Sequence, residues 1–418
     1  MSRKKEQKKD FSKFWENFKK SFLLFIENFK EKKIKYIASF FLFVLLFSLT
    51  VWTFASSHST IIAGGSTSVD IVLQDLTNQY RNEEKGGDDI LYNSLGSSAA
   101  LVGVKNNSYS FGFLSDELQD DEADELFSDY NVLRFAFAID YLLIIYNLPE
   151  DSINQSSLEQ SDFLGDHLIV GSWDDTNANE DGPKNIQELY SGDYTWKNVF
   201  GDQLVSNETT TKPPITYTRE SGSGTRSFFE SSVIEENSYN YNSVVASNGA
   251  MLDSVESTPG SVGYVSFSYL NKIIYDYQNG NHDIHIAFLG FPNKNPSAII
   301  SPYKTIDDKG EAIDPQNPFN DNYSLTRPFT GIVNTSSKDF DKAMKFITWM
   351  LAPAFSQNLP TQPTVDEASY WYLKNGLKPI SQSDDYFKKY LDYDYGAGNK
   401  NIWDYMQIYK DEIPGEII

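Results

Sequence analysis

The sequence predicts an α/β protein with a mostly parallel sheet, preceded by one transmembrane helix. The α/β class follows from the residues beyond about 59, where short β-prone apolar runs alternate with amphipathic segments and Gly- and Ser-rich turns join them. Alternation of strands with helices is typical of parallel sheets. The transmembrane helix follows from residues 36–55, which carry no charge and are long enough to cross a hydrocarbon core of about 30 Å as a helix.

The charge of the chain falls into three parts. The formal net charge of the 418 residues is −23 at pH 7. Residues 1–36 hold 12 Lys and Arg against 5 Asp and Glu, a net of +7, and residues 37–58 hold none, so the remainder carries −30. Because the basic residues precede the apolar segment, the N-terminus is expected in the cytoplasm and the acidic remainder outside the cell. An acidic outer part argues against binding nucleic acid.

Two interpretations of the apolar segment at 36–55 stay open. The small residues Ala55, Ser56 and Ser57 could form the processing site of a cleaved signal peptide. The long basic region before the segment favours an uncleaved anchor instead. The chain contains no cysteine, which excludes disulfides, thiol chemistry and a lipidated cysteine. Residues 36–55 are therefore the one candidate anchor in the sequence, and we expect a single-pass protein of the cell membrane.

Residues 1–35 are expected to form a basic amphipathic helix. Lysines fill one face, and a stripe of apolar residues recurs at helical spacing on the other. Such a helix would lie on the anionic inner leaflet or dock on a cytoplasmic or membrane partner, and the sequence supports both. The stripe consists of Phe11, Phe14, Trp15, Phe18, Phe22, Phe25, Ile26 and Phe29.

The first elements of the outer part follow the order strand, loop, helix. Residues 59–64 form a β-prone run, and the apolar residues from Val69 to Tyr80 are spaced as on one face of a helix. Residues 92–104 repeat the layout, with Gly96-Ser97-Ser98 opening the second helix. Residues 135–149 form a continuous apolar run, as expected of a strand buried on both faces.

Later segments repeat the layout and add two insertions. Within residues 215–234, a polar run leads from a strand into a third helix. Residues 340–351 form another amphipathic helix, which Pro353 is expected to stop. The Asn-, Asp- and Ser-rich stretch at 150–185 and the Pro-rich stretch at 290–322 are expected to be surface insertions. Neither insertion, nor the tail beyond about residue 365, suggests a role.

Three Ser- and Thr-rich loops at predicted helix N-termini point to an anion site. They are residues 63–70, 96–98 and 218–225. A helix N-terminus presents unpaired N–H groups and a partial positive charge, hydroxyls add rotatable donors, and glycine allows close approach of the backbone. One such loop would be explained by helix capping. Three loops, with Arg219 just before the third, favour an oxyanion site, because arginine offers a planar fork of donors.

Seven segments together resemble one known family. They are similar to the extracytoplasmic phosphate-binding proteins of phosphate ABC importers (PstS-like, class II solute-binding proteins). The resemblance covers roughly residues 60–351, and the Arg-x-x-Gly-Ser-Gly-Thr run at 219–225 is its most specific element. In chain order the segments are AGGSTSV, LGSSAAL, FGFLSDEL, NIQELYSGDYTWKNVFGD, TRESGSGTRSFFE, GSVGYVSFSYL and YSLTRPFTGIV.

This resemblance implies a two-lobed class II periplasmic-binding-protein fold that closes like a Venus flytrap around one phosphate ion. The chain would cross between lobes near Asn147-Leu148 and near Gly263-Tyr264. Lobe one would then comprise 59–147 plus 264–418, and lobe two 148–263. A binding protein of this family is not an enzyme and needs no cofactor or metal. Its expected partner is the ABC permease of a phosphate importer, on which a monomer docks.

The resemblance also implies a phosphate shell drawn from both lobes. Asp116 would accept the proton of hydrogen phosphate and so disfavour sulfate, which carries none at pH 7. Some relatives hold the arginine with an acid two positions later, where this chain has Ser221. Glu220 is expected to point to the other side of an extended loop, so no partner of Arg219 is predicted. The residues carried over are Thr67, Ser68, Ser97, Ser98, Asp116, Arg219, Ser223, Gly224 and Thr225.

Other functions fit the sequence less well or stay open. A serine hydrolase would need glycine two positions before Ser223, which the string ESGSGT lacks. A metal site at His282 and His285 conflicts with strand-like alternation, which places the two side chains on opposite faces. A binding protein for another small oxyanion, and a surface phosphate sensor or adhesin that retains the fold, stay open as alternatives.

Overall fold

The chain divides into two compact units, Met1–Ser59 and Thr60–Ile418. The predicted helix at 1–35 and the predicted membrane segment at 36–55 lie almost entirely outside the residues that the structure describes, as do most of the insertions at 150–185 and 290–322. Within the described part, no helix combines the length and apolar character needed to span a membrane. The computed structural model describes residues 16, 18–21, 44, 60–82, 88–152, 169–171, 185–200, 204–234, 239–290, 300–304, 318–355, 368–396 and 398–412.

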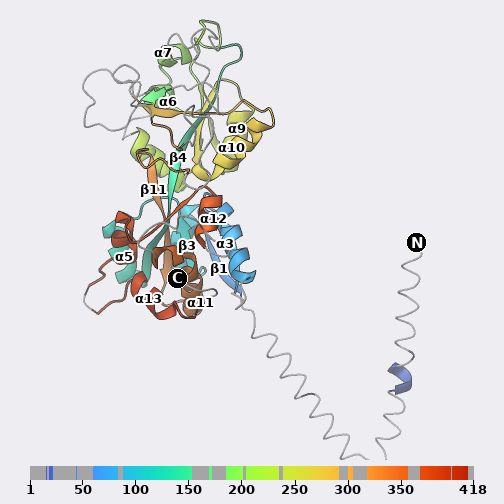
Figure 1. Cartoon of the computed structure of the whole chain (residues 1–418), viewed down its shortest axis with the longest axis vertical. Coiled ribbons are helices and arrows are strands. Elements are labelled where there is room, and N and C mark those ends of the chain that lie inside the picture. The colour runs from blue at the N-terminus through green and yellow to red at the C-terminus, as the bar shows by residue number, and fades with distance from the viewer. Residues whose placement is uncertain are drawn as a thin grey trace, which may run out of the picture. The chain divides into compact units, whose positions relative to one another are not determined.

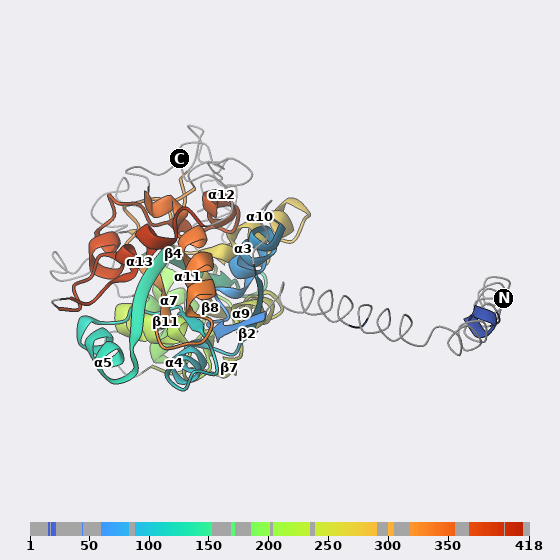
Figure 2. The same ribbon diagram turned by 90° about the horizontal axis from the view of Figure 1, so that it is seen from below.

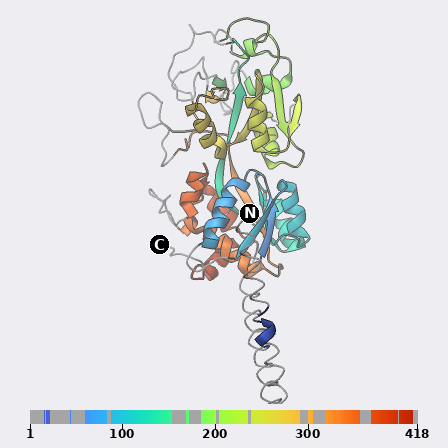
Figure 3. The ribbon, with the colours of Figure 1, turned by 90° about the vertical axis from the view of Figure 1, so that its right-hand side faces the viewer.

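The unit Thr60–Ile418 consists of two lobes built along one long strand (Figure 1). This strand is β4 (Val132–Asn147), and Figure 3 shows it in teal as it passes from one lobe into the other. β11 (Thr326–Asn334) pairs with the first part of β4, and β8 (Ser261–Ser266) pairs with Leu142–Asn147. Each lobe therefore extends from its own part of the same strand, and the predicted two-lobed α/β fold is confirmed.

The first lobe contains a sheet in the order β2-β1-β3-β11-β4, and β12 pairs with β4. β1 is parallel to β2 and β3, whereas β11 is antiparallel to β3 and β4. Helices pack around this sheet (Figure 2). The other elements of the lobe are β1 (Thr60–Gly65), α3 (Asp70–Asn82), β2 (Asp89–Ser94), α4 (Ser97–Lys105), β3 (Phe111–Leu114), α5 (Asp120–Tyr130), α11 (Phe340–Met350), α12 (Ala368–Lys374), β12 (Lys378–Pro379) and α13 (Ile402–Tyr409).

The second lobe contains a sheet in the order β4-β8-β6-β7, and β9 pairs with the second part of β4. β6 is parallel to β7 and β8. Two short strands, β5 (Ile169–Gly171) and β10 (Phe288–Gly290), form a separate parallel pair. The remaining elements are α6 (Asn185–Ser191), α7 (Trp196–Phe200), β6 (Ile215–Arg219), α8 (Gly224–Phe229), β7 (Ser243–Val245), α9 (Asn248–Glu256), α10 (Leu270–Gln278) and β9 (His285–Ile286).

The apolar patterns of the sequence account for the elements that carry the site. In α3, the residues at helical spacing are buried: Val72, Leu73, Leu76 and Tyr80. All 16 residues of β4 are buried, as predicted from its continuous apolar run. The predicted helix near the C-terminus is α11, and Pro353 lies in the short 3-10 helix that follows it. The core elements thus form where the sequence indicates them.

The sheet is mixed, which corrects the prediction of a mostly parallel sheet. The outer strands of both lobes pair in parallel, as strand–helix–strand connections require. Around β4, however, every pairing is antiparallel among the described strands. The reason is that β4 passes from one lobe into the other as a single strand. Strands that bring the chain back toward the first lobe must therefore run against it.

Candidate functional site

The loop between β1 and α3 leads into the junction of the lobes. Gly65 ends β1 with φ at 145°, and a Cβ there would lie 2.0 Å from the Phe113 carbonyl oxygen, so only glycine fits. The loop is then held by Ser66, whose hydroxyl accepts from the Ser68 amide at 3.1 Å. Thr67 is half-buried and Ser68 is buried. The local sequence thus fixes both predicted residues at the carboxyl end of a parallel strand, where ligands bind in α/β sheets.

The loop before α4 lies beside the end of β3. Gly96 precedes the helix with φ at 93°. Ser97 is buried, and its hydroxyl accepts from the Ser115 amide at 3.2 Å. Ser98 is exposed, and its hydroxyl donates to the Gly222 carbonyl of the second lobe at 3.3 Å. The two neighbouring serines therefore have different tasks, one inside the first lobe and one between lobes.

The third loop runs from the end of β6 to α8 in the second lobe. Ser223 is the N-cap of α8, and its hydroxyl accepts from the Arg226 amide at 3.4 Å. Gly222 has φ at 84°, a backbone conformation that favours glycine. At Gly224, an added Cβ would lie 2.8 Å from the Ser97 hydroxyl oxygen and 3.0 Å from Asp116 Cβ. The lobes thus approach so closely that this position has no room for a side chain.

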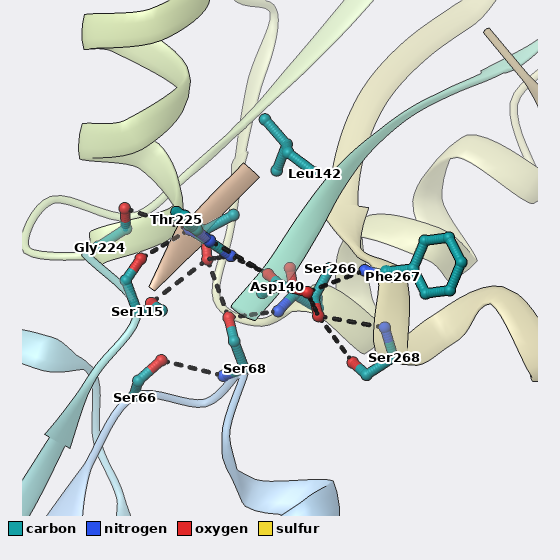
Figure 4. A network of polar contacts seen from close by, with 12 residues as sticks. Ser66, Ser68, Ser115, Asp140, Leu142, Gly224, Thr225, Ser266, Phe267 and Ser268 are labelled. Atoms are coloured by element: carbon teal, nitrogen blue, oxygen red, sulfur yellow. Dashed lines mark hydrogen bonds and ion pairs between the residues drawn. The ribbon is translucent and has the colours of Figure 1, made fainter. Parts of the chain in front are cut away.

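The three loops meet through hydrogen bonds between the lobes. Ser68 Oγ and Thr225 Oγ1 are 2.8 Å apart, and Ser115 Oγ and Thr225 Oγ1 are 3.5 Å apart (Figure 4). Thr225 and Ser68 are both buried. The structure thus brings all nine predicted site residues to one junction: Thr67, Ser68, Ser97, Ser98 and Asp116 from the first lobe, and Arg219, Ser223, Gly224 and Thr225 from the second.

Arg219 reaches across this junction from the end of β6. Its Nη2 donates to Thr67 Oγ1 at 2.9 Å, and its side chain is 1% exposed. Glu220 holds it by two bonds, Nε to Oε2 and Nη2 to Oε1, each at 2.8 Å. The expectation that Glu220 points away was wrong, because β6 ends at Arg219 and the Ser223 amide bonds the Glu220 carbonyl at 3.2 Å. In that turn, neighbouring side chains no longer alternate.

Asn248 is a site residue that the sequence reasoning missed. It is fully buried at the start of α9, where Ser247 is the N-cap. Its Nδ2 donates to Ser68 Oγ at 2.7 Å, and its Oδ1 accepts from Arg219 Nη1 at 3.1 Å. Asn248 therefore links the two lobes through one amide. Its only signal in the sequence is a Ser-Asn pair at a helix start, which is also ordinary capping chemistry.

Asp140 and Arg327 form a second charged pair that the sequence reasoning missed. Both side chains are 0% exposed, and Arg327 Nη2 lies 2.8 Å from Asp140 Oδ2. The Ser266 hydroxyl donates to Asp140 Oδ1 at 2.7 Å. Burial raises the pKa of Asp140, and the Arg327 charge opposes that shift. The sequence offered one indication of this pair, because Asp140 and Arg327 are each a single charged residue within an apolar strand segment.

Asp116 follows β3 and is half-buried. Its Oδ1 accepts from the Glu117 amide at 2.9 Å, and its carbonyl accepts from the Thr330 hydroxyl at 2.8 Å. Burial raises the pKa of the Asp116 carboxyl, while the Glu117 amide, the Arg327 charge and the Ser227 hydroxyl oppose the shift. The carboxylate thus already acts as a hydrogen-bond acceptor at the edge of the junction, next to Gly224.

The charged groups at the junction have no excess of positive charge, so an anion there would be held mainly by dipoles. Two guanidinium groups, of Arg219 and Arg327, face three carboxylates, of Glu220, Asp140 and Asp116. An oxyanion here would be bound by hydroxyls, amide N–H groups and helix N-termini. Across the described part of the chain, no group of His, Asp and Glu side chains has metal-binding geometry. His282 and His285 stack on Tyr277 and Tyr146.

Comparisons with known proteins agree with this architecture. A family model described as a PBP superfamily domain matches residues 53–354. The phosphate-binding protein PstS of Borreliella burgdorferi is 24% identical over 220 residues, 50% of this chain and 64% of that protein. The chain therefore spans less than two thirds of that relative's length.

Two solved structures share the fold with this chain. One, described as a DING protein, has a TM-score of 0.51 and 11% identity, and the match covers 82% of this chain and 97% of that one. The other, an ancestral soluble variant of the human phosphate-binding protein, has a TM-score of 0.50 and 12% identity over 83% and 97% of the two chains. At such identities the likeness concerns the fold alone.

Proposed function

Because this chain belongs to the PBP superfamily, we propose that it captures inorganic phosphate between its two lobes and delivers it to an ABC importer. The observation that carries the proposal is the meeting of three Ser- and Thr-rich loops from both lobes beside the buried Arg219. Phosphate as the ion is supported by the names of the relatives, which include a PstS and a phosphate-binding protein. The function is binding and transfer, with no chemical step.

We assign the phosphate oxygens to donors from both lobes. A buried oxyanion must have its lost hydration replaced by hydrogen bonds, and charged acceptors form the stronger ones. The hydroxyls that now bond one another across the junction would turn toward the ion, since a hydroxyl rotates at little cost. Arg219 would add a two-pronged contact. The proposed shell is Thr67, Ser68, Ser97, Ser98 and Asp116 with Arg219, Ser223, Gly224 and Thr225.

Asp116 has a distinct role in this proposal, because it accepts where the others donate. Hydrogen phosphate carries a proton that a carboxylate can accept, and sulfate carries none at pH 7. Against sulfate, the Asp116 carboxylate would face a second negative charge without a hydrogen bond. The half-buried position of Asp116 beside Gly224 supports this assignment. Selectivity for phosphate therefore rests on one carboxyl group.

We also propose lobe boundaries from the strand pairings. β4 pairs with β11 as far as Tyr141 and with β8 from Leu142, which favours a first crossing near Tyr141-Leu142 rather than at the expected Asn147-Leu148. β8 and β9 pair with the second part of β4, which favours a second lobe that continues beyond Gly263-Tyr264 to about the end of β10. The return crossing would then fall before β11. Limited rotation about β4 and β11 would open and close the junction.

The cellular arrangement is proposed from the sequence. Residues 36–55 would anchor the protein in the cell membrane, with residues 1–35 in the cytoplasm and the binding unit outside. Labelling of intact cells would test this arrangement. A membrane-impermeant amine reagent should modify lysines of the binding unit, such as the exposed Lys338, and leave residues 1–35 unmodified. Modification of residues 1–35 in intact cells would contradict it.

Equilibrium dialysis tests the binding step. The full-length protein, unfolded and refolded in detergent to remove bound ions, is dialysed against radiolabelled phosphate. We expect saturation at one phosphate per chain and little displacement by excess sulfate. Absence of saturable binding would overturn the proposal, and equal displacement by sulfate would favour the alternative of a general oxyanion-binding protein.

Phosphate uptake by cells tests the delivery step. Cells that lack this chain should take up phosphate poorly at low external concentration. The full chain should restore uptake, and the Arg219→Ala variant should not. Normal uptake without the chain, combined with saturable binding in dialysis, would favour a surface phosphate sensor over a transport component.

A further inference from the structure

The pair Asp140–Arg327 lies at the point where β4 changes partners. Tyr141 of β4 pairs with Thr326 of β11, and the next residue, Leu142, pairs with Ser266 of β8. Asp140 and Arg327 are themselves opposite each other in the β4–β11 register. The charged pair is therefore one residue from the place where the strand leaves the first lobe for the second, which is where a rotation between lobes would be centred.

Arg327 contacts the anion loops of both lobes from this position. Its Nη1 donates to the Ser115 carbonyl of the first lobe at 2.7 Å. The same nitrogen lies 3.4 Å from the Gly224 carbonyl of the second lobe, and Nη2 donates to Thr225 Oγ1 at 3.2 Å. One guanidinium thus bonds the end of β3 and the start of α8, two segments that the proposed function requires to meet around one ion.

Asp140 joins the same lobes from the other side of the pair. Its Oδ2 accepts from Arg327 Nε at 3.1 Å and Nη2 at 2.8 Å. Its Oδ1 accepts from the Ser266 hydroxyl at 2.7 Å and the Phe267 amide at 3.2 Å, both at the end of β8 (Figure 4). The carboxylate therefore connects β11 of the first lobe with β8 of the second through the middle of β4.

We infer that Asp140 and Arg327 are positioning residues that favour the closed arrangement of the two anion loops without contacting the ion. This inference rests on the proposed function. If the lobes rotate apart, the bonds of Arg327 to Asp140 and Ser115 can persist, whereas those to Gly224 and Thr225 must lengthen. Interactions present in only one of two states shift the population toward that state. The pair thereby lowers the dissociation rate of the bound ion.

The surroundings of Arg327 separate it from a ligand-binding arginine. Burial alone does not separate them, because the side chain of Arg219 is 1% exposed and that of Arg327 is 0% exposed. The rings of Phe228 and Phe329 lie 5.4 Å and 5.3 Å from the guanidinium carbon of Arg327. Its donors are directed at main-chain carbonyls, a hydroxyl and a carboxylate with no accessible surface. Arg327 is therefore committed to protein partners, and its effect on an ion must pass through Ser115, Gly224 and Thr225.

If the Asp140–Arg327 pair only stabilised the fold, it would not need to lie between the two lobes. Buried ion pairs contribute little to stability compared with apolar residues of similar volume, because desolvation offsets the attraction. Replacing both members together should therefore leave the fold intact while it removes the tie between the lobes. A positioning role therefore predicts weaker phosphate binding in a variant that still folds.

The test uses Arg327→Met combined with Asp140→Asn in the full-length chain. The Asp140→Asn change keeps an oxygen for the Ser266 hydroxyl and the Phe267 amide, and the double change leaves no buried charge unpaired. The matched control is Arg134→Met with Asp120→Asn, which removes another buried arginine whose hydrogen-bond acceptors lie in the first lobe. Since the chain has no cysteine, Glu125→Cys and Asp193→Cys, both exposed, give one dye on each lobe for energy transfer.

We expect inorganic phosphate to increase energy transfer in the otherwise unaltered chain. In the Arg327–Asp140 variant, the Kd for phosphate should rise about 10- to 100-fold through faster dissociation, with little change in association rate and with a cooperative melting transition retained. The control pair should leave Kd unchanged. An unchanged Kd and dissociation rate in the Arg327–Asp140 variant would overturn the inference. If the unaltered chain showed neither phosphate binding nor a change in energy transfer with phosphate, the proposed function would be overturned instead.

Arg327→Lys keeps the test decisive if the double variant fails to melt cooperatively. Lysine preserves the positive charge beside Asp140 but lacks the planar fork that reaches Ser115, Gly224 and Thr225 together. Its Kd for phosphate should rise in the same direction, with a cooperative melting transition retained. A lysine variant with the Kd and dissociation rate of the unaltered chain would contradict the positioning role.

Discussion

Two buried arginines lie at the same junction and are held in opposite ways. Arg219 and Arg327 are 1% and 0% exposed, and each is paired with a carboxylate at 2.8 Å. The side chain of Glu220, the partner of Arg219, is 31% exposed, whereas that of Asp140, the partner of Arg327, is 0% exposed. One pair therefore borders solvent, and the other is sealed within the protein.

The other contacts of the two guanidinium groups differ in the same sense. Arg219 donates to the side chains of Thr67 and Asn248, which can rotate and exchange partners. Arg327 donates to the Thr225 hydroxyl, but also to the main-chain carbonyls of Ser115 and Gly224, which cannot rotate away. An arginine can bind an incoming anion only if its present partners can yield. The comparison therefore supports the proposal that Arg219 binds the ion and that Arg327 positions the loops.

The largest expected effect is loss of stability on replacing Arg327 alone. Arg327→Ala leaves the Asp140 carboxylate buried without its partner, which costs about 3–5 kcal/mol of unfolding free energy. Arg219→Ala leaves Glu220 partly solvated but removes the donor to the buried Asn248 Oδ1, so it should cost less, about 1–3 kcal/mol. Urea denaturation of both variants measures the difference. Equal losses of stability would remove the distinction between the two arginines.

The next largest effect is loss of phosphate affinity on replacing Arg219. Hydrogen bonds to charged groups contribute about 1.5–3 kcal/mol each, so Arg219→Ala should weaken phosphate binding at least about 100-fold. The fold should be retained, as judged by the thermal transition. Arg81→Ala is the control, because Arg81 is an exposed arginine in a surface ion pair with Asp89. Unchanged affinity in the Arg219 variant would exclude this residue from the phosphate shell.

A smaller effect is expected on selectivity when Asp116 loses its charge. Asp116→Asn replaces an acceptor by an amide that can also donate, so sulfate should bind better and phosphate worse. We expect the ratio of phosphate to sulfate affinity to fall about tenfold or more, a change of about 1.4 kcal/mol. Competition titrations measure the ratio. If the ratio stays constant, the preference for phosphate originates elsewhere.

The same carboxyl group predicts how selectivity changes with pH. Burial raises the pKa of Asp116 above its ordinary value of 3.8, so the group takes up a proton at a higher pH than an exposed aspartate would. Below that raised pKa the neutral carboxyl can donate to sulfate, and sulfate should compete better at pH 4 than at pH 8. The Asp116→Asn variant has no carboxyl to protonate at this position, so its sulfate affinity should not increase in this way at low pH. A sulfate affinity that follows the same pH profile in both proteins would contradict the assignment.

The smallest effect is expected at Ser98. This residue is exposed, and its hydroxyl makes a long bond of 3.3 Å to Gly222. Ser98→Ala should change phosphate affinity by less than about 1 kcal/mol, whereas Ser97→Ala, at a buried serine, should cost more. Calorimetric titration of the two variants with phosphate shows which one loses more affinity. The reverse order would show that the exposed serine carries the contact.

The sequence was sufficient to predict the loops of the site because their chemistry is local. Glycine at positive φ, serine at helix starts and a 3.6-residue apolar period are all visible within a short window, and they correctly located β1, α3, α4 and α8. The approach of the lobes at Gly224 followed from the family resemblance rather than from any local pattern.

The contacts that depend on register could not be predicted in this way. Asp140 and Arg327 meet only because β4 and β11 pair antiparallel with these two residues opposite each other. Nothing in a single sequence fixes that register, although one charge within a buried strand signals a paired partner. Asn248 was missed because a helix start explains it locally. Glu220 was misjudged because strand alternation was extended one residue too far, into a turn.

Calorimetric titration of residues 59–418, unfolded and refolded to remove bound ions, would show whether the three loops bind phosphate. We expect phosphate to bind with a stoichiometry of one per chain, and sulfate at the same concentrations to give no comparable heat. An absence of heat with phosphate would contradict the claim that these loops form a phosphate site. Equal binding of both anions would contradict the selectivity assigned to Asp116.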